Sequence, residues 1–423
     1  MPVDWDDWPL GEGEDAFLLH IASSYWSKPP DRIGVAVSGG GDSIAALHLM
    51  ARSAAHVGWT VEAVTVDHGL RPESAAEAEF VAQACARLDL RHDVLHWTHE
   101  AIAGNLQDQA RRARYALMVA WARGRGIADI MLGHTADDQA ETFLMGLARE
   151  AGLDGLTGMR RRWQEAGVEF HRPFLQTTRA DLRAYLLRNE LGWKEDPSNE
   201  NDKFTRVKAR KVMKALQPMG ITVEKLSGTI LNLVTARQAL IETVAETAGR
   251  ISTERAGEVI FDRAVLRRAP QEVIRRLLIA ALRWVSGAQY APRAAAVVRL
   301  EIAVYRKRDA TLWGCRMRVS DTDVRIVREP RAVASAISPP NQLWDNRWRL
   351  DGPSDPGLEA RALTAAGLRG CKGWRDTGIS RDALLVSPAI WRGDTLVAAP
   401  LAGVSNGWTA RIDAGFASFI ISH

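Results

Sequence analysis

Residues 33–50 read Ile-Gly-Val-Ala-Val-Ser-Gly-Gly-Gly-Asp-Ser-Ile-Ala-Ala-Leu-His-Leu-Met, and this stretch decides the fold. Its first five residues are an apolar run typical of a buried strand, and its last seven have the apolar spacing of a helix. A glycine-rich loop joins the two. The order of strand, loop and helix predicts the start of a β-α-β unit in a parallel sheet.

The glycine-rich loop predicts a phosphate-binding site. It consists of Ser38, Gly39, Gly40, Gly41, Asp42 and Ser43. Such a loop turns backbone N–H groups toward one point, and the helix N-terminus adds a partial positive charge. Glycines let the backbone approach a pyrophosphate, serine hydroxyls add donors, and Asp42 either caps free amides or holds a cation. The alternative is a glycine turn that binds no ligand.

Two common nucleotide-binding loops do not fit this stretch. No lysine follows the loop, so the chain lacks the Gly-Lys-Ser/Thr ending with which a Walker loop holds the β- and γ-phosphates. The Gly-x-Gly-x-x-Gly spacing of a dinucleotide-binding fold is missing as well. We therefore expect chemistry other than transfer of the γ-phosphate.

The chain is long enough for two or three domains. Its 423 residues are 46% apolar and 25% charged, as in globular proteins. We predict an α/β protein with a Rossmann-like catalytic domain around a parallel sheet at residues 1–210, a helical domain at 211–330, and a small mixed α+β domain at 341–423. A stretch rich in Pro, Ser and Ala at 330–340 is the expected linker.

Short β-rich runs alternate with helical patterns from residue 33 to about 190. The expected strands are Ile33–Val37, Thr60–Val66, His92–Trp97, Ala128–Leu132 and Val168–Phe170. Ligands of open parallel sheets bind at the carboxyl ends of the strands. Polar residues follow these ends at 38–43, 67–69 and 133–135. After residue 203 the alternation stops, and we expect helices up to about 310 and strand-like segments within 311–328.

Charge and cysteine usage indicate a cytoplasmic protein that binds a polyanion. The formal net charge is only +4, but residues 203–214 hold six basic side chains and no acidic one. Three widely spaced cysteines fit neither a disulfide framework nor a Cys-x-x-Cys site, so we expect reduced, buried thiols. The acidic N-terminus is unlike a signal peptide, and no apolar run reaches the roughly 18 residues of a membrane span.

Residues 134–142 read His-Thr-Ala-Asp-Asp-Gln-Ala-Glu-Thr and begin a helix directly after an expected strand. Thr135 is a suitable N-cap with Asp138 three residues later, so a plain helix start explains both. It does not explain His134. Asp138 and Glu141 share one helical face with His134 just before it, and this group is suited to hold Mg²⁺ or to accept a proton.

Three arginines, Arg111, Arg112 and Arg114, lie at the start of another expected helix. Solvated surface arginines are the usual explanation for such a group. An arginine that reaches the end of the sheet would instead suit a pyrophosphate leaving group or a tRNA phosphate. The sequence alone leaves both interpretations open.

These segments, in this order, resemble the tRNA(Ile)-lysidine synthetase family. The loop at 38–43 resembles the Ser-Gly-Gly-x-Asp-Ser signature of PP-loop enzymes, which split ATP between the α- and β-phosphates. The further segments that carry the resemblance are Val66–Arg71, Asn105, Ala110–Arg111, Arg114–Tyr115, Gly133–His134, Asp138–Thr142, Gly155–Met159, Arg172–Pro173 and Glu195–Asn199. The resemblance spans residues 33 to about 210 and is loose in the C-terminal part.

The resemblance implies an ATP-dependent ligase. ATP adenylates the wobble cytidine of an isoleucine tRNA with a CAU anticodon at the C2 carbonyl oxygen, and free lysine then displaces AMP. The product, lysidine, pairs with A and changes decoding from AUG to AUA. The expected partners are this tRNA, ATP, Mg²⁺ and free lysine, with no membrane. The resemblance and the apolar faces of the helical region also allow a homodimer.

The resemblance and the residue chemistry together imply four catalytic residues: Asp42, Arg114, His134 and Asp138. The loop at 38–43 binds the ATP phosphates, Arg114 neutralises them, and Asp42 and Asp138 hold Mg²⁺. His134 and Asp138 position or deprotonate the attacking amine. A cluster of basic residues without acids is assigned to tRNA phosphates: Arg206, Lys208 and Arg210. An acidic side chain near the sheet end is expected to bind lysine, but the sequence does not say which.

Two other functions compete with this hypothesis. Another PP-loop tRNA-modifying enzyme, such as a thiolase, would need reactive thiols or an iron–sulfur site, and the chain has no Cys-x-x-Cys. A non-catalytic tRNA-binding protein would explain the basic segment. Against it, the glycine-rich loop and residues 134–142 both keep all of their polar groups.

Overall fold

A computed structural model describes residues 18–22, 25–26, 30–69, 74–98, 106–195, 205–288, 292–353 and 355–422. The chain forms two compact units, Met1–Arg237 and Gln238–His423. The first unit contains the glycine-rich loop, and the second contains the antiparallel sheets. The expected division at residues 210, 330 and 341 stays a prediction, and residue 210 itself lies inside a helix.

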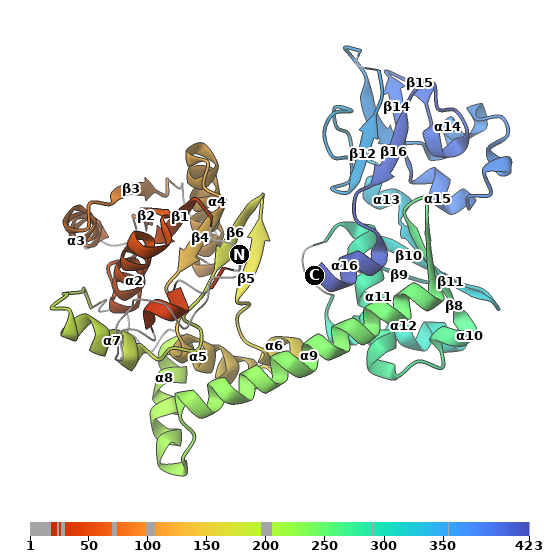
Figure 1. Ribbon diagram of the computed structural model, residues 1–423. Coiled ribbons are helices and arrows are strands. Elements are labelled where there is room, and N and C mark those ends of the chain that lie inside the picture. Colours follow the sequence, from red (N-terminus) through yellow and green to blue (C-terminus); the bar gives the residue numbers. More distant parts are fainter. Residues whose placement is uncertain are drawn as a thin grey trace. The chain divides into compact units, whose positions relative to one another are not determined.

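A six-stranded sheet forms the centre of the first unit (Figure 1). Its strands are β1 (Arg32–Ala36), β2 (Thr60–Asp67), β3 (Arg91–His96), β4 (Asp129–Leu132), β5 (Arg162–Glu165) and β6 (Val168–His171). They lie in the order β3-β2-β1-β4-β6-β5, and every pair is parallel except β5 with β6. The predicted α/β class and its five strands are confirmed. The mostly polar edge strand β5 is an addition that the sequence pattern does not predict.

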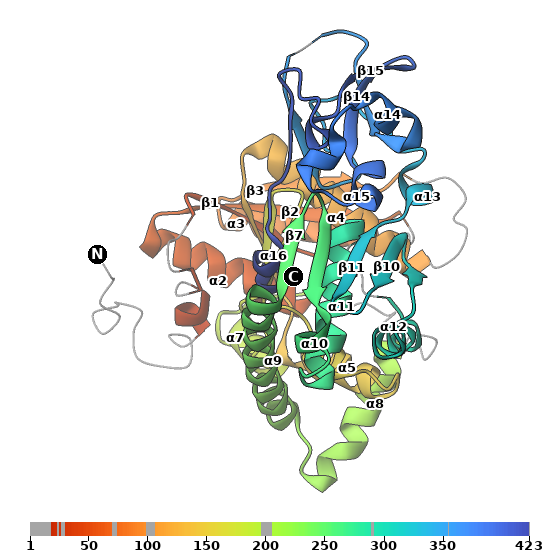
Figure 2. The ribbon, with the colours of Figure 1, turned by 90° about the vertical axis from the view of Figure 1, so that its right-hand side faces the viewer.

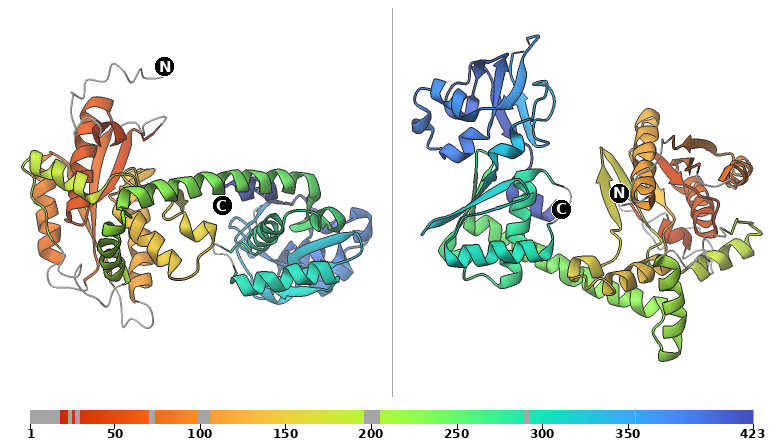
Figure 3. Two further views of the ribbon diagram at one scale, coloured as in Figure 1. Left: turned by 90° about the horizontal axis from the view of Figure 1, so that it is seen from below. Right: turned by 180° about the vertical axis from the view of Figure 1, so that it is seen from behind.

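Helices cover both faces of this sheet (Figure 3). Helices α2 (Gly41–Val57), α3 (Ser74–Arg87) and α7 (Arg179–Arg188) contribute to the core on one face. Helix α4 (Leu106–Arg125) contributes to the core on the other. In β1, Ile33 and Val35 point to the α2 side, whereas Ile130 of β4 points to α4. Because strands covered on both faces have little water contact, they read as continuous apolar runs.

Further helices of the first unit follow β4 in the sequence. They are α5 (Ala136–Leu147), α6 (Leu153–Leu156), α8 (Thr205–Leu216), the 3₁₀ helix η3 (Gln217–Met219) and the first part of α9 (Val223–Ile251). Helix α8 packs against α5. Its buried residues are Val207, Ala209 and Met213. The basic segment predicted to bind tRNA therefore lies beside the helix that begins after His134.

The second unit contains a five-stranded antiparallel sheet in the order β7-β8-β11-β10-β9 (Figure 2). The elements are β7 (Ser252–Arg255), β8 (Glu258–Asp262), α10 (Arg263–Leu266), α11 (Gln271–Ser286), α12 (Ala294–Arg306), β9 (Ala310–Leu312), β10 (Cys315–Val319) and β11 (Asp323–Arg328). The expectation of helices throughout 203–310 is wrong at 252–262, which form a hairpin. Ala256 and Gly257 at its tip have φ of 49° and 77°, as a type I′ turn requires.

The rest of the second unit has the mixed α+β character that the sequence predicts. Its elements are α13 (Pro330–Val333), β12 (Trp348–Asp351), β13 (Glu359–Ala362), α14 (Thr364–Gly370), η4 (Trp374–Thr377), α15 (Arg381–Leu385), β14 (Pro388–Arg392), β15 (Thr395–Ala398), η5 (Pro400–Ala402), β16 (Thr409–Ile412) and α16 (Phe416–Ser422). Ser338, in the expected linker, pairs with Ala360. Among the residues described, no helix has the length and apolar character needed to cross a membrane.

Candidate active site

A cavity of about 330 Å³ lies at the carboxyl ends of β1, β2 and β4. The polar and charged residues of the predicted site that line it are Ser38, Ser43, Arg114 and His134. Strand β1 lies between β2 and β4, which continue the sheet in opposite directions, and this change of direction is where open α/β sheets bind ligands. Three segments far apart in the sequence thus meet at one place, as their positions after predicted strands imply.

The glycine-rich loop is closed by its own hydrogen bonds. The N–H of Ser38 donates to Ser43 Oγ at 3.1 Å, and Ser43 Oγ donates to the carbonyl of Gly40 at 2.9 Å. Gly39 has φ of 86°, a conformation that residues with a side chain rarely adopt. The loop therefore has a fixed shape, with Asp42 in the first turn of α2.

Close packing explains why position 133, directly after β4, is a glycine. A Cβ at this position would lie 2.9 Å from the carbonyl oxygen of Asp42 and 3.1 Å from Cα of Ser43. Both are backbone atoms, so they cannot move away as a flexible side chain would. Gly133 allows the end of β4 to lie directly against the start of α2, which brings His134 to the loop.

Asp138 serves both the helix and the site. Its Oδ2 accepts a hydrogen bond from the N–H of Thr135 at 3.0 Å, which is the capping interaction that the sequence predicts. Its Oδ1 faces the guanidinium groups of Arg179 at 3.6 Å and Arg206 at 3.9 Å. Burial alone would raise the pKa of Asp138, but the interactions with His134, Arg179 and Arg206 and the hydrogen bond from Thr135 outweigh burial and lower that pKa. Asp138 is therefore a carboxylate at neutral pH.

Arg179 joins the acidic residues of the site, and the sequence analysis does not identify it. Its Nε donates to Asp42 Oδ2 at 3.0 Å, and its terminal nitrogens lie 3.6 Å from Asp138 Oδ1 and 3.7 Å from Glu141 Oε1. Burial raises the pKa values of Asp42 and Glu141, and the arginines beside them act in the opposite direction. Asp42, Asp138 and Glu141 thus form one acidic cluster around the guanidinium of Arg179.

The three residues assigned to tRNA phosphates separate into two groups. Arg206 faces Asp138, and Arg210 Nε donates to Glu141 Oε1 at 2.6 Å. Lys208 lies on the exposed side of α8. Positions 206 and 210 are four residues apart and so share a helical face, which is the sequence signal that separates them from Lys208. The structure places both arginines at the acidic cluster.

His134 accepts a hydrogen bond from another arginine. Arg172 Nε donates to His134 Nδ1 at 3.2 Å, so the proton of the neutral ring lies on Nε2. Burial lowers the pKa of His134 well below its ordinary value, and Arg172, Arg114 and Arg206 act in the same direction while Asp138 opposes them. His134 is therefore a neutral imidazole with an N–H at Nε2.

A positively charged wall lies beside the cavity. The guanidinium carbons of Arg111 and Arg114 lie 5.4 and 5.3 Å from the ring centre of Tyr115. Burial would raise the pKa of Tyr115, but Arg114, Arg111 and Arg172 together lower it. Arg114 lines the cavity. This charge suits an anionic guest such as a nucleotide phosphate.

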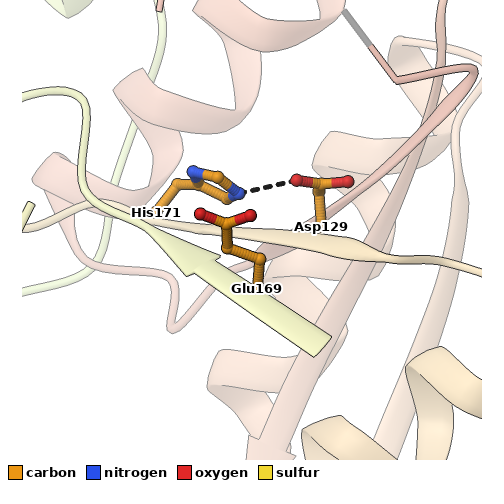
Figure 4. A group of neighbouring side chains, drawn as sticks. All are labelled: Asp129, Glu169 and His171. Carbon is orange, nitrogen blue, oxygen red and sulfur yellow. Dashed lines mark hydrogen bonds and ion pairs between the residues drawn. The ribbon is translucent and has the colours of Figure 1, made fainter. Parts of the chain in front are cut away.

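A second group of acidic and histidine side chains lies in the same sheet (Figure 4). Asp129 of β4 and His171 of β6 form a pair with Nε2 and Oδ1 2.7 Å apart, and the Glu169 carboxylate lies nearby. The rings of Tyr25 and Trp26 pack against the buried His171. None of the three residues lines the cavity. The arrangement is that of a histidine–carboxylate pair that connects two strands.

Of the other segments that carry the resemblance, some connect elements of the fold and some lie outside the described residues. The side chain of Gln139 accepts from the N–H of Met159 at 2.6 Å and donates to the carbonyl of the same residue at 3.2 Å, which links α5 to the segment 155–159. Leu70, Arg71, Asn105 and residues 196–199 lie outside the described part of the chain.

The loop, the parallel sheet and the cavity at the strand ends define a PP-loop nucleotide-binding protein, and residues 15–216 match the family model described as a PP-loop domain. Sequence comparison is more specific. The chain is 44% identical over 414 residues to the tRNA(Ile)-lysidine synthase of Ruegeria pomeroyi, covering 97% of this chain and 99% of that protein. It is 40% identical to the one of Hyphomonas neptunium, covering 70% and 82%. The chain belongs to the tRNA(Ile)-lysidine synthase family.

A solved structure similar to this chain is a U34-tRNA thiolase from Methanococcus maripaludis. The two are 13% identical, with a TM-score of 0.46, and the match covers 52% of this chain and 80% of that one.

Proposed function

We propose that this protein ligates lysine to the C2 position of the wobble cytidine in tRNA(Ile) with a CAU anticodon. ATP is cleaved to AMP and pyrophosphate, and the product is lysidine. Identity of 44% to a tRNA(Ile)-lysidine synthase over 97% of this chain supports this function. The observation that carries it is the acidic cluster of Asp42, Asp138 and Glu141 beside the phosphate-binding loop, because a lysine ligase needs a site for a cationic amine next to a site for ATP.

The loop at 38–43 is proposed to bind the ATP phosphates, with Arg114 opposite. Support comes from the fixed loop, the N-terminus of α2 and the charge of Arg114 at one cavity. Arg114 stabilises charge that develops on the phosphates as pyrophosphate leaves.

Asp42 and Asp138 are proposed to hold Mg²⁺. The donor set fits: Mg²⁺ prefers oxygen ligands and is usually held by one or two carboxylates together with substrate phosphates. Asp42 belongs to the loop and lies in the first turn of α2, and Oδ1 of Asp138 faces the cluster rather than the helix cap. Bound there, Mg²⁺ would neutralise phosphate charge.

Glu141 is proposed to bind the ammonium group of lysine, with Asp138 nearby. The side chain of Glu141 is 2% exposed, and its Oε2 is buried without a hydrogen-bond partner in the described structure. An unpaired buried carboxylate oxygen is costly. A cationic guest would provide the missing partner.

His134 is proposed to position the substrate through its Nε2–H. Arg172 occupies Nδ1 and Nε2 carries the proton, so the neutral ring has no free lone pair with which to accept another proton. Of the two roles that the sequence allows, positioning or deprotonating the amine, this geometry supports positioning. Asp138 then remains the candidate acceptor for the proton that the amine releases.

The tRNA and the cellular setting complete the proposal. Lys208 on the exposed side of α8 is proposed to contact a tRNA phosphate, and the target cytidine must leave its stack to reach the cavity. A cytoplasmic location and a homodimer are further parts of the proposal, which the expected tRNA partner and the apolar faces of the helical region support.

The test is a ligation assay. The protein is incubated with ATP, Mg²⁺, labelled lysine and a tRNA(Ile) transcript with a CAU anticodon, and with a matched transcript whose wobble C is replaced by U. Label confined to the CAU transcript, together with AMP release, is the expected result. AMP release without lysine transfer would indicate another PP-loop tRNA-modifying enzyme. Neither signal would indicate a non-catalytic tRNA-binding protein.

One observation weighs against a thiolase. The three cysteines are buried and free, and burial raises the pKa values of the Cys85 and Cys315 thiols to about 12. Sulfur transfer needs thiolates that are accessible near neutral pH.

A further inference from the structure

Arg179 is the first residue of α7, and its guanidinium lies among carboxylates from two other helices. It contacts Asp42 of α2 at 3.0 Å and Asp138 and Glu141 of α5 at 3.6 and 3.7 Å. The Arg179 side chain is 21% exposed and that of Glu141 only 2%. Arg179 is therefore not a solvated surface arginine. It is a partly buried cation that three acidic groups share.

The stability of α7 does not explain this charge. A cation in the first turn opposes the helix dipole. The N-terminus of α7 is already capped by Thr178 with Asp181, and the backbone N–H of Arg179 donates to Asp137 Oδ2 at 2.7 Å. These backbone contacts fix α7 against α5 without any charged side chain at position 179. The guanidinium serves the acidic cluster rather than its own helix.

Charge balance shows what the guanidinium does. The carboxylates that meet here are Asp42, Asp137, Asp138 and Glu141, and the guanidinium groups are those of Arg179, Arg206 and Arg210. Arg206 and Arg210 each face one member of the acidic cluster, whereas Arg179 faces all three. Without Arg179, Asp42 would lose the cation that opposes the effect of burial on its pKa.

We infer that Arg179 is a resident counter-cation, which occupies the carboxylate oxygens needed by Mg²⁺ and lysine and so keeps free divalent cations out of the site until nucleotide is bound. This inference rests on the proposed function, which assigns Asp42 and Asp138 to Mg²⁺. A metal ion that arrives with ATP brings phosphate oxygens as further ligands and so competes with the guanidinium. A free metal ion brings only water.

The test measures binding of Mn²⁺, a substitute for Mg²⁺, in the absence of ATP, from the electron paramagnetic resonance signal of the free ion. The variants are Arg179→Gln and, as matched control, Arg188→Gln at the exposed end of the same helix. Removing a positive charge within about 4 Å of three carboxylates should tighten Mn²⁺ binding about tenfold or more. The control should bind Mn²⁺ as weakly as wild type.

A double variant shows whether the gain in Mn²⁺ affinity arises at Asp42. Asp42→Asn combined with Arg179→Gln should return Mn²⁺ affinity close to the wild-type value. No gain in Arg179→Gln, or a gain that persists in the double variant, would overturn the inference. If the glutamine variant does not fold, Arg179→Lys replaces it. The lysine ammonium ends about where the guanidinium carbon of Arg179 lies, one bond short of the terminal nitrogens that face Asp138 and Glu141. An intermediate gain is therefore expected, and an unchanged affinity would contradict the inference.

The ligation assay keeps this inference separate from the proposed function. Tighter Mn²⁺ binding in Arg179→Gln, with no lysidine formed by wild type, would retain the counter-cation and reject the lysine ligase. Lysidine formation by wild type with unchanged Mn²⁺ binding in the variant would do the reverse.

Discussion

Arg172 Nε donates a hydrogen bond to His134 Nδ1 at 3.2 Å and thereby fixes which nitrogen of the imidazole carries its proton. Arg172 is itself held in place, because one of its terminal nitrogens donates to the carbonyl of Arg160 at 2.7 Å and its guanidinium carbon lies 4.0 Å from the ring centre of Trp163. His134 is therefore held in one orientation and in one protonation state, as a group that positions a substrate requires.

The low pKa of His134 predicts a pH-dependent contribution to stability. Burial, followed by the arginines, keeps the folded ring neutral at pH values where the unfolded chain, with a histidine pKa near 6.5, binds a proton. The unfolded state then binds more protons, so the free energy of unfolding falls as pH drops below about 6.5, by at most about 1.4 kcal/mol per pH unit for this group.

Replacing the residue should remove this dependence. Urea unfolding of wild type and His134→Gln at about pH 7 and about pH 5.5 should show a smaller loss of stability at the lower pH in the variant. Equal losses in the two proteins would mean that the folded ring titrates normally.

The two oxygens of Asp138 predict different results for two substitutions. In Asp138→Asn the amide oxygen still accepts from the N–H of Thr135, whereas Asp138→Ala loses this half of the capping box. We expect the alanine variant to be less stable than the asparagine variant by about 1 kcal/mol. Both should lose lysidine formation by at least about a hundredfold, because neither has the carboxylate.

Thermal or urea unfolding and the ligation assay separate the two roles of Asp138. Equal stability of the variants would refute the capping role. Full turnover by Asp138→Asn would remove Asp138 from the catalytic residues.

The packing of Gly133 against α2 predicts a specific effect on ATP binding. In Gly133→Ala the new methyl group meets the backbone of Asp42 and Ser43, so the start of α2 and the loop must shift. We expect ATP affinity to fall about tenfold or more, which corresponds to about 1.4 kcal/mol.

Gly124→Ala is the matched control for Gly133→Ala. Gly124 lies in helix α4, is exposed, and has no atom within 4 Å of the added Cβ. It should bind ATP normally and be slightly more stable, by up to about 1 kcal/mol. Equal ATP affinity in both variants, measured by calorimetry, would mean that the loop tolerates the shift.

Local patterns were sufficient for much of this fold and site. The five parallel strands come from apolar runs between helical patterns, and the cavity residues follow strand ends, whose position in an α/β sheet is a general rule. The hairpin at 252–262 was harder to predict, because strands of four and five residues give little periodic signal.

The position of Arg179 among the acidic residues of the site could not be predicted from local sequence patterns. Arg179 is 137 residues from Asp42 and 38 from Glu141 in the sequence, and nothing around it separates it from the other arginines of its helix. Its partners become apparent only when α2, α5 and α7 pack together. By contrast, the spacing of Arg206 and Arg210 does carry a signal, because residues four apart share a helical face.

Lys208 is exposed whereas Arg210 contacts the acidic cluster, and this difference predicts different effects on tRNA binding when each is replaced. Lys208→Gln should weaken tRNA binding similarly for every sequence and reduce the slope of log affinity against log salt by about one. Arg210→Gln should leave this slope unchanged, because the guanidinium of Arg210 is paired with Glu141. Filter binding at several salt concentrations measures both. A reduced slope in Arg210→Gln would restore its assignment to a tRNA phosphate.

Arg210→Gln should instead change how lysine use depends on pH. Burial already raises the pKa of Glu141, and the hydrogen bond from Arg210 is the largest opposing effect. Without it the pKa rises further, so Glu141 becomes protonated at a higher pH in the variant than in wild type, and the KM for lysine of the variant should increase more steeply as the pH falls. Raising the pH ionises Glu141 again, so the KM of the variant should approach the wild-type value at higher pH. A KM ratio of variant to wild type that does not change with pH would show that Glu141 does not bind lysine through its charge.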